Sequence, residues 1–328
     1  MPAVSVLMVF HRTTPFLRPA VQSILTQTFR DFELLLVDNG TGCGLGLLGE
    51  QVRDPRIQLI TLPVNLGISA GRNAALAKAR GEFVALLDDD DIALPIRLEK
   101  QVALLRSDPR LGLVSSRADR IDEQGRVTGR EFSLLDERSQ MVFNNYTMPA
   151  PASSYTGRRE WFERFPFRGD FDHAEDFDFV ARVAEVSALR GAPEILLHYR
   201  QHAGQVTRTQ AALQIRRACA IRLITARRRH GRPENLPDAL ARIASGGGPM
   251  PPLVEVYADF AHQCLREGFP LLAVYHARKM VAVRRDGPAV LRALRLVAAA
   301  LPRARGEAAT LLRMFLTGPL RTHDLHPA

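Results

Sequence analysis

Four consecutive carboxylates follow an apolar segment in the first third of the chain. Residues 83–87 are apolar throughout, and Asp88, Asp89, Asp90 and Asp91 come directly after them. Adjacent acids repel one another, and a hard cation or cationic side chains offset that repulsion. On an extended segment, Asp88 and Asp90 would share one face, and Asp89 and Asp91 the other. Because Mg²⁺ and Mn²⁺ bind one or two protein carboxylates together with water and phosphate oxygens, the pattern predicts a divalent-cation site.

A further acid, Asp38, follows another mainly apolar segment, residues 32–37. The carboxyl ends of parallel strands meet at one edge of an open α/β sheet, which is where such sheets bind ligands. We therefore expect Asp38 and Asp88 at the same edge, where a nucleotide would sit. The plainer alternatives are a capped turn before Gly40 for Asp38, and an acidic loop or helix start for the four aspartates.

The elements that must position these acids alternate along the chain. Short apolar segments predict strands at residues 4–9, 32–37, 57–62, 83–87, 111–115 and 194–199. Helical spacing predicts helices at residues 19–27, 69–79, 96–105 and 175–187, the second of them capped by Ser69. Residues 116–150 are polar and are expected to be irregular, with a turn at 123–125. The alternation predicts an α/β fold, Rossmann-like, with a mostly parallel sheet flanked by helices.

Charge divides the chain into two regions. Residues 1–204 contain 24 basic and 27 acidic groups, whereas residues 205–328 contain 20 and 8, a net charge of +12. We expect a domain over residues 1–208 and a basic, mainly helical extension over 209–328, with a break at the glycines and prolines of 245–252. The three cysteines show neither metal-ligand spacing nor a disulfide framework, and no leader or spanning segment is visible. These features predict a cytoplasmic protein, or one placed peripherally on the inner face of the membrane.

Taken together, these segments resemble the family 2 glycosyltransferases, inverting enzymes of the GT-A fold that use nucleotide sugars, over roughly residues 3–208. The resemblance rests on ordered motifs: Ser5-Val6-Leu7-Met8, Val37-Asp38-Asn39-Gly40, Asn65-Leu66-Gly67, Gly71-Arg72-Asn73, the four aspartates as a D-x-D region, Ala174-Glu175-Asp176-Phe177-Asp178, and Tyr199-Arg200-Gln201-His202. It implies a hexosyltransferase that moves a sugar to a glycan or lipid-linked acceptor in surface polysaccharide assembly.

The resemblance also implies roles for individual residues. Asp176 would be the catalytic base, with Glu175 as the second candidate. A Mn²⁺ or Mg²⁺ cofactor would be held by Asp90 directly, by Asp88 through water, and by His202. Contacts to the nucleotide sugar would come from Asp38, Asn65, Arg72, Asn73, Asp88 and Asp89. A solvated helix residue is the alternative for Arg72, and a surface or capping histidine for His202.

The basic extension leaves several interpretations open. Its arginines can be solvated helix faces. With the apolar positions Leu291, Leu294 and Val297, they also predict amphipathic helices that meet an anionic membrane surface. A different class of protein is a further alternative: a nucleotide-sensing module whose tail binds nucleic acid. No zinc finger, helix-turn-helix or aromatic RNA motif supports it. A catalytically silent scaffold is the last alternative, and the joint presence of the acids named above argues against it.

Overall fold

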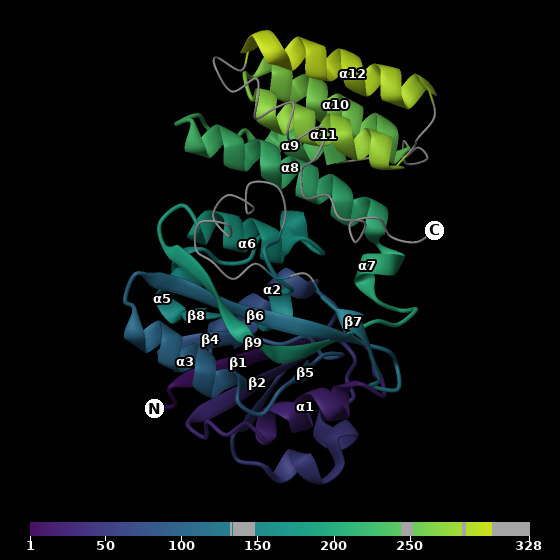
Figure 1. Cartoon of the computed structure of the whole chain (residues 1–328). Helices are drawn as coiled ribbons and strands as arrows, with labels where there is room; N and C mark the ends of the chain where they lie inside the picture. Colours follow the sequence, from purple (N-terminus) through teal and green to yellow (C-terminus); the bar gives the residue numbers. More distant parts are fainter. Residues whose placement is uncertain (132, 134–147, 244–251, 284–286, 304–328) are drawn as a thin grey trace. The chain divides into compact units, whose positions relative to one another are not determined.

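The computed structural model describes residues 1–131, 133, 148–243, 252–283 and 287–303. The chain divides into two compact units, Met1–Gln205 and Val206–Ala328. The first, unit 1, combines a sheet with helices, and the second, unit 2, is helical in its described residues (Figure 1).

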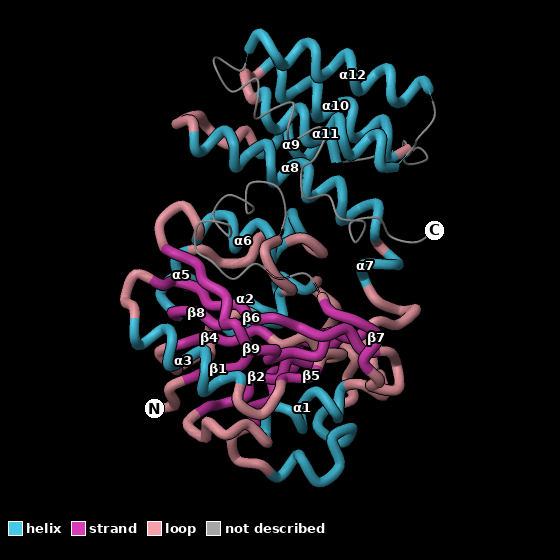
Figure 2. The backbone as a smooth tube through the Cα atoms, in the orientation of Figure 1, coloured by secondary structure: helices cyan, strands magenta, loops and turns pink. Residues whose placement is uncertain are grey.

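In the described part of unit 1, nine strands form one sheet (Figure 2). They are β1 (Val4–Phe10), β2 (Phe32–Asn39), β3 (Ile57–Leu62), β4 (Phe83–Leu86), β5 (Ile92–Ala93), β6 (Leu111–Ile121), β7 (Val127–Arg130), β8 (Thr156–Arg158) and β9 (Ala188–Arg200). Their spatial order is β3-β2-β1-β4-β8-β6-β9-β5, and β7 pairs with β6. The four strands β1 to β4 pair in parallel, as do β6 and β9, whereas the pairs made by β5, β7 and β8 are antiparallel. The predicted α/β class is confirmed, with a mixed sheet.

Helices pack on both faces of this sheet. They are α1 (Leu17–Leu25), α2 (Ile68–Leu76), α3 (Arg97–Ser107), α5 (Arg159–Arg164) and α6 (Glu175–Val183). Side chains alternate along β1, so Val4, Val6 and Met8 join the core that α1 and α3 cover, and Leu7 and Val9 join the core beneath α2 and α6. All residues of β1 and β2 are buried, as expected of central parallel strands. Because β2 and β4 flank β1 in parallel, Asp38 and the four aspartates lie at one edge of the sheet.

The segment expected to be irregular is partly strand. Residues 116–121 continue β6, and residues 127–130 form β7. The predicted turn between them is confirmed, since the Gly125 N–H donates to the Asp122 carbonyl at 3.0 Å. Polar composition misled the prediction, because Ser115 and Ser116 are fully buried within β6. Residues 134–147 lie outside the described residues.

The prediction that Ser69 caps the start of α2 is wrong. The helix begins at Ile68, after Gly67 with a φ of 88°. The backbone N–H of Ser69 donates to Oδ1 of Asp172 at 3.1 Å, and its hydroxyl donates to the Arg168 carbonyl at 3.2 Å. A Cβ on Gly67 would lie 1.9 Å from Oδ2 of Asp172, so only glycine fits there. A residue 103 positions away therefore caps the helix, which local sequence cannot reveal.

Unit 2 contains α7 (Val206–Thr209), α8 (Ala211–Arg229), α9 (Leu236–Ile243), α10 (Leu253–Arg266), α11 (Pro270–Val283) and α12 (Gly287–Ala300). Helix α11 packs against both α10 and α12 (Figure 1). Helix α12 buries Ala293 and Leu296 and leaves Leu291 and Leu294 about half exposed. Within the described residues, none of the helices combines the length and the apolar character that crossing a membrane requires. Most of the expected break at 245–252 lies outside the described residues.

Candidate active site

The four aspartates form a turn. Strand β4 ends at Leu86, the backbone N–H of Asp91 donates to the carbonyl of Asp88 at 3.3 Å, and β5 begins at Ile92. The segment of the four aspartates is therefore not extended, which was the condition for Asp88 and Asp90 to share a face. The turn directs the four side chains differently: Asp91 is fully buried, whereas 37% of the Asp88 side chain is exposed.

The end of β9 holds this turn in place. The backbone N–H of Arg200 donates to Oδ1 of Asp91 at 2.8 Å, and its Nε donates to the carbonyl of Asp90 at 2.8 Å. Nε2 of His202 lies 2.9 Å from Oδ2 of Asp90, and the His202 ring packs on Phe16 with centroids 4.9 Å apart. The structure thus brings the predicted ligands Asp90 and His202 together. Sequence reasoning assigned no role to Arg200, although it stands two residues before His202.

Arg72 connects the acidic turn to the start of α6. Its Nη2 donates to Oδ1 of Asp88 at 2.8 Å and its Nη1 to Oε1 of Glu175 at 2.6 Å. The guanidinium is 5% exposed and lies over the Phe167 ring, 5.3 Å from its centroid. Burial alone would lower the pKa of Arg72, but the charges of Glu175, Asp88 and Asp176 raise it above its ordinary value. The predicted contact to a diphosphate would compete with two carboxylates.

The two candidate bases differ in their surroundings. Glu175 is 4% exposed, and burial raises its pKa to about 8, even though the neighbouring Arg72 favours the carboxylate. Its Oε2 has no hydrogen-bond partner within the described residues. Asp176 is half-buried, and its Oδ1 accepts the adjacent Phe177 N–H at 2.7 Å. Burial raises the pKa of Asp176, and the positive charge of Arg72 opposes this rise.

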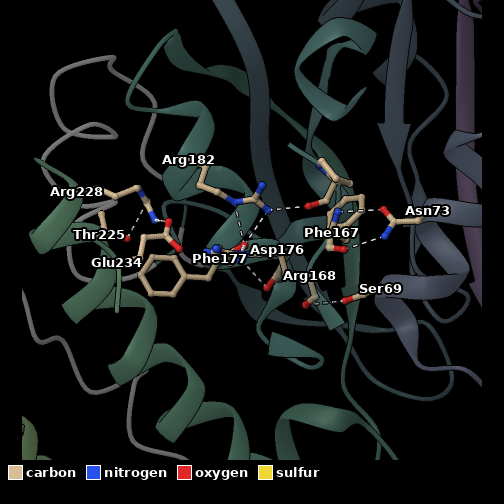
Figure 3. Close-up of polar contacts among 12 residues, drawn as sticks. Ser69, Asn73, Phe167, Arg168, Asp176, Phe177, Arg182, Thr225, Arg228 and Glu234 are labelled. Atoms are coloured by element: carbon tan, nitrogen blue, oxygen red, sulfur yellow. Dashed lines mark hydrogen bonds and ion pairs between the residues drawn. The ribbon is translucent and has the colours of Figure 1, made fainter. Parts of the chain in front are cut away.

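Structural contacts occupy other polar groups around α6 (Figure 3). The fully buried Asp178 accepts from Nε of Arg168 at 2.9 Å and from Nε of Arg182 at 3.0 Å. Asn73 donates to the Phe167 carbonyl at 2.8 Å and accepts the Phe167 N–H at 3.0 Å. The Phe167 backbone therefore already engages both ends of the Asn73 amide, with which the predicted nucleotide contact would compete. Of the acids on the first turn of α6, Asp176 is the most available.

Two residues at the end of β2 make different contacts: Asp38 bonds to the turn that follows β2, and Asn39 bonds to the loop after β3. Asp38 is fully buried, and its Oδ1 accepts the N–H and the hydroxyl of Thr41 at 2.8 and 2.7 Å. Burial would raise the pKa of Asp38, but these hydrogen bonds lower it below its ordinary value. Asn39 donates to Oδ1 of the exposed Asn65 at 3.1 Å. Gly40 has a φ of 87°, and a Cβ there would lie 2.2 Å from the Asn65 nitrogen. The geometry favours the turn-capping alternative for Asp38 and leaves Asn65 at the surface.

Charge at the acidic turn fits a cation. Burial raises the pKa of Asp89 well above its ordinary value, and the adjacent Asp90 and Asp88 raise it further. Asp90 offers an oxygen donor, which suits Mn²⁺ or Mg²⁺, whereas the nitrogen donor of His202 is not a typical ligand of Mg²⁺. Within the described residues no three His, Cys, Asp or Glu side chains converge as a metal-binding group. Asp88 turns to Arg72 instead, so phosphate and water oxygens would have to complete the coordination of a cation here.

Comparisons with known sequences identify one family. Residues 5–165 match the model of "Glycosyl transferase family 2". The chain is 31% identical to the uncharacterized glycosyltransferase MJ1057 of Methanocaldococcus jannaschii over 208 residues, which cover 61% of this chain and 71% of that protein. It is 28% identical to an uncharacterized glycosyltransferase of Haemophilus influenzae over 223 residues, 63% of this chain and 68% of that protein. The O-antigen biosynthesis glycosyltransferase WbnJ of Escherichia coli is 34% identical over 128 residues, 37% of this chain and 48% of WbnJ.

Solved structures agree on the fold. The crystal structure of S. aureus TarS 1-349 matches with a TM-score of 0.61 at 15% identity, covering 93% of this chain and 91% of TarS 1-349. The same protein in complex with UDP-GlcNAc matches with a TM-score of 0.60 at 15% identity, covering 93% and 92%. The likeness spans nearly the whole chain and concerns the fold. The family match, the relatives and the shared fold show that the chain belongs to glycosyltransferase family 2 and has the GT-A fold.

Proposed function

We propose that this glycosyltransferase moves a sugar from a nucleotide-sugar donor to a hydroxyl group of a glycan or lipid-linked acceptor, with inversion and with Mn²⁺ or Mg²⁺. One observation carries the proposal: Arg72 bonds both to Asp88 of the acidic turn and to Glu175, which directly precedes Asp176. A donor-side acidic turn and an acceptor-side carboxylate therefore lie on either side of one buried guanidinium. Inverting transfer requires a leaving-group site and a base, and this arrangement supports the presence of both.

Asp176 is the proposed base. Transfer with inversion needs a carboxylate that takes the proton of the acceptor hydroxyl while that oxygen attacks the anomeric carbon opposite the leaving group. Glu175 is less suited because Arg72 holds its Oε1 at 2.6 Å. Asp178 is less suited because Arg168 and Arg182 hold its carboxylate. Asp176 is half-buried, and its raised pKa makes it a stronger base than an ordinary aspartate.

The donor is proposed to be a UDP-sugar. TarS has been crystallised with UDP and with UDP-GlcNAc, and a further relative, WfgD of Escherichia coli, is named for UDP-Glc. Asp90 and His202 would hold the cation, and Asp89 would lie beside it. When bound, the cation would supply positive charge to the departing diphosphate. Arg72, which already bonds to Asp88, would add a second positive charge close to that diphosphate.

The names of several relatives support a role in surface polysaccharide assembly. WbnJ is an O-antigen biosynthesis enzyme, and WfgD is named for an acceptor linked to diphosphoundecaprenol. Contact with an anionic membrane through unit 2 belongs to this proposal, since Leu291 and Leu294 are half exposed on α12 within the region of net charge +12.

Turnover of a donor panel tests the proposal. The purified chain is incubated with UDP-, GDP- and dTDP-sugars and Mn²⁺, with and without a lipid-linked glycan extract, and released nucleoside diphosphate is measured. We expect the extract to stimulate release from UDP-sugars. EDTA should abolish that release, and Asp176→Asn should lower it on the order of 10²–10⁴-fold. If no donor is turned over by the folded protein, a catalytically silent scaffold becomes the better account.

A further inference from the structure

Phe16 is a half-buried aromatic residue directly before α1, and its backbone is held on both sides. Its N–H donates to Oγ1 of Thr14 at 3.3 Å, and its carbonyl accepts the Ala20 N–H at 3.0 Å. The next residue, Leu17, is 2% exposed and belongs to the core that α1 covers. A ring that extends from such a fixed backbone can set the position of the side chains that pack on it.

Two buried side chains from the end of β9 pack on the Phe16 ring. The guanidinium carbon of Arg200 lies 4.8 Å from the ring centroid, and the centroid of the His202 ring lies 4.9 Å from it. An aromatic face attracts a guanidinium, and tilted rings at this separation stabilise each other beyond the area that they bury. Phe16 therefore contacts two residues that are far from it in sequence and next to the acidic turn.

Arg200 and His202 both contact Asp90. Nε of Arg200 donates to the Asp90 carbonyl at 2.8 Å, and Nε2 of His202 lies 2.9 Å from Oδ2 of Asp90. Arg200 has further anchors, because its Nη1 donates to the carbonyls of Asp122 and Glu123 at 2.9 and 3.1 Å. Within the described part of the chain, Asp90 is the one polar partner of the His202 imidazole. The orientation of that imidazole therefore depends on the aromatic ring that packs on it.

We propose that Phe16 is a positioning residue, whose ring holds the His202 imidazole against Asp90 before any cation binds. Without the ring, His202 would sample other rotamers, and the binding of a cation would have to restrict them again. The ring spares the site that loss of conformational freedom. The hold on His202 follows from the contacts above, whereas its value for a cation rests on the proposed function.

A double-mutant cycle without metal tests the positioning. In EDTA, we expect the Tm of Asp90→Ala/His202→Ala to depart from the sum of the two single effects by about 2 °C or more, because the contact between the two residues is lost only once. In a Phe16→Leu background, that departure should shrink to less than half, because the imidazole no longer faces Asp90. Phe16→Tyr, which keeps the ring, should retain the full departure. An equal departure with Phe16 and with Phe16→Leu, or none with Phe16, would overturn the proposal.

Affinity for Mn²⁺ alone separates positioning from general support of the fold. We expect Phe16→Leu to weaken Mn²⁺ binding about three- to tenfold, and Phe16→Tyr to bind within about twofold of wild type, because ordering one side chain costs that much affinity. In a His202→Ala background, Phe16→Leu should have no further effect, because the residue that it positions is gone. An equal loss of affinity with and without His202 would contradict the proposal.

Phe32→Leu is the matched control. The guanidinium of Arg56 lies over the Phe32 ring, 4.4 Å from its centroid, but Phe32 begins β2, at the opposite end of that strand from Asp38. Its replacement removes a similar contact between an arginine and a ring, and it should change neither the Mn²⁺ affinity nor the departure in Tm. The same losses in Phe32→Leu as in Phe16→Leu would contradict the proposal. Absence of Mn²⁺ binding by the wild type would count against the metal in the proposed function, and the metal-free cycle would still decide the role of Phe16.

Discussion

Nη1 of Arg72 lies 2.6 Å from Oε1 of Glu175, although 103 residues separate them in sequence. Both side chains are about 5% exposed, so the pair is an internal one. The same guanidinium bonds to Asp88 at 2.8 Å. Arg72 therefore couples the two halves of the active site, and its first role is to hold them together.

Loss of Arg72 should be costly for stability. In Arg72→Met, Glu175 and the 37% exposed Asp88 lose their partner. At pH 9, above the Glu175 pKa of about 8, breaking this buried pair from one side costs about 3–5 kcal/mol. We expect a fall of that size in the free energy of unfolding, measured by urea titration. Arg292→Met is the control, since Arg292 pairs with Glu255 and 41% and 50% of the two side chains are exposed. Equal costs for the two variants would show that Arg72 is not an internal clamp.

Glu175 should make stability depend on pH. Its pKa is about 8 in the folded protein and 4.5 ordinarily, so between these values the folded state holds a proton that unfolding releases. The contribution of Glu175 to stability is therefore greatest below about pH 4.5 and is lost as pH rises through 8. We expect the Tm of wild type to fall relative to Glu175→Gln from pH 5 to 9. Parallel Tm curves would rule out the raised pKa.

Replacement of the base should separate turnover from binding. Asp176→Asn retains the shape of the side chain and its contact with the Phe177 N–H. We expect kcat to fall on the order of 10²–10⁴-fold, since that is what a positioned base contributes. The Kd for the donor should stay within about threefold. A comparable loss of kcat in Glu175→Gln, with Asp176→Asn still active, would reassign the base.

His202 should contribute to cation affinity. Its Nε2 lies 2.9 Å from Oδ2 of Asp90, and it would complete a two-residue ligand set. We expect His202→Ala to weaken Mn²⁺ binding by about tenfold or more, measured by the Mn²⁺-dependent rise in Tm. His198→Ala serves as the control, because His198 lies on β9 opposite Ile92. Unchanged Mn²⁺ affinity in His202→Ala would leave that residue as a support for Asp90 alone.

Sequence reasoning predicted the fold better than the contacts within the site. The apolar segments and ordered motifs were enough for the α/β class, the family and the common edge of Asp38 and Asp88, because these depend on patterns that lie close in sequence. The partners of Asn73 and Ser69 depend on Phe167 and Asp172, which lie about 100 residues away. An acidic loop at the four aspartates was one of the alternatives, but the sequence could not decide for it, since the strand pattern of β4 does not encode where pairing stops.

The most direct test of the central claim is isothermal titration of UDP-sugars in Mn²⁺ and in EDTA, comparing wild type with Asp90→Ala. The account predicts binding to wild type in Mn²⁺, loss of that binding in EDTA, and loss in Asp90→Ala even with Mn²⁺. Equal affinity in EDTA, or in Asp90→Ala, would contradict a donor site built on a cation at the acidic turn.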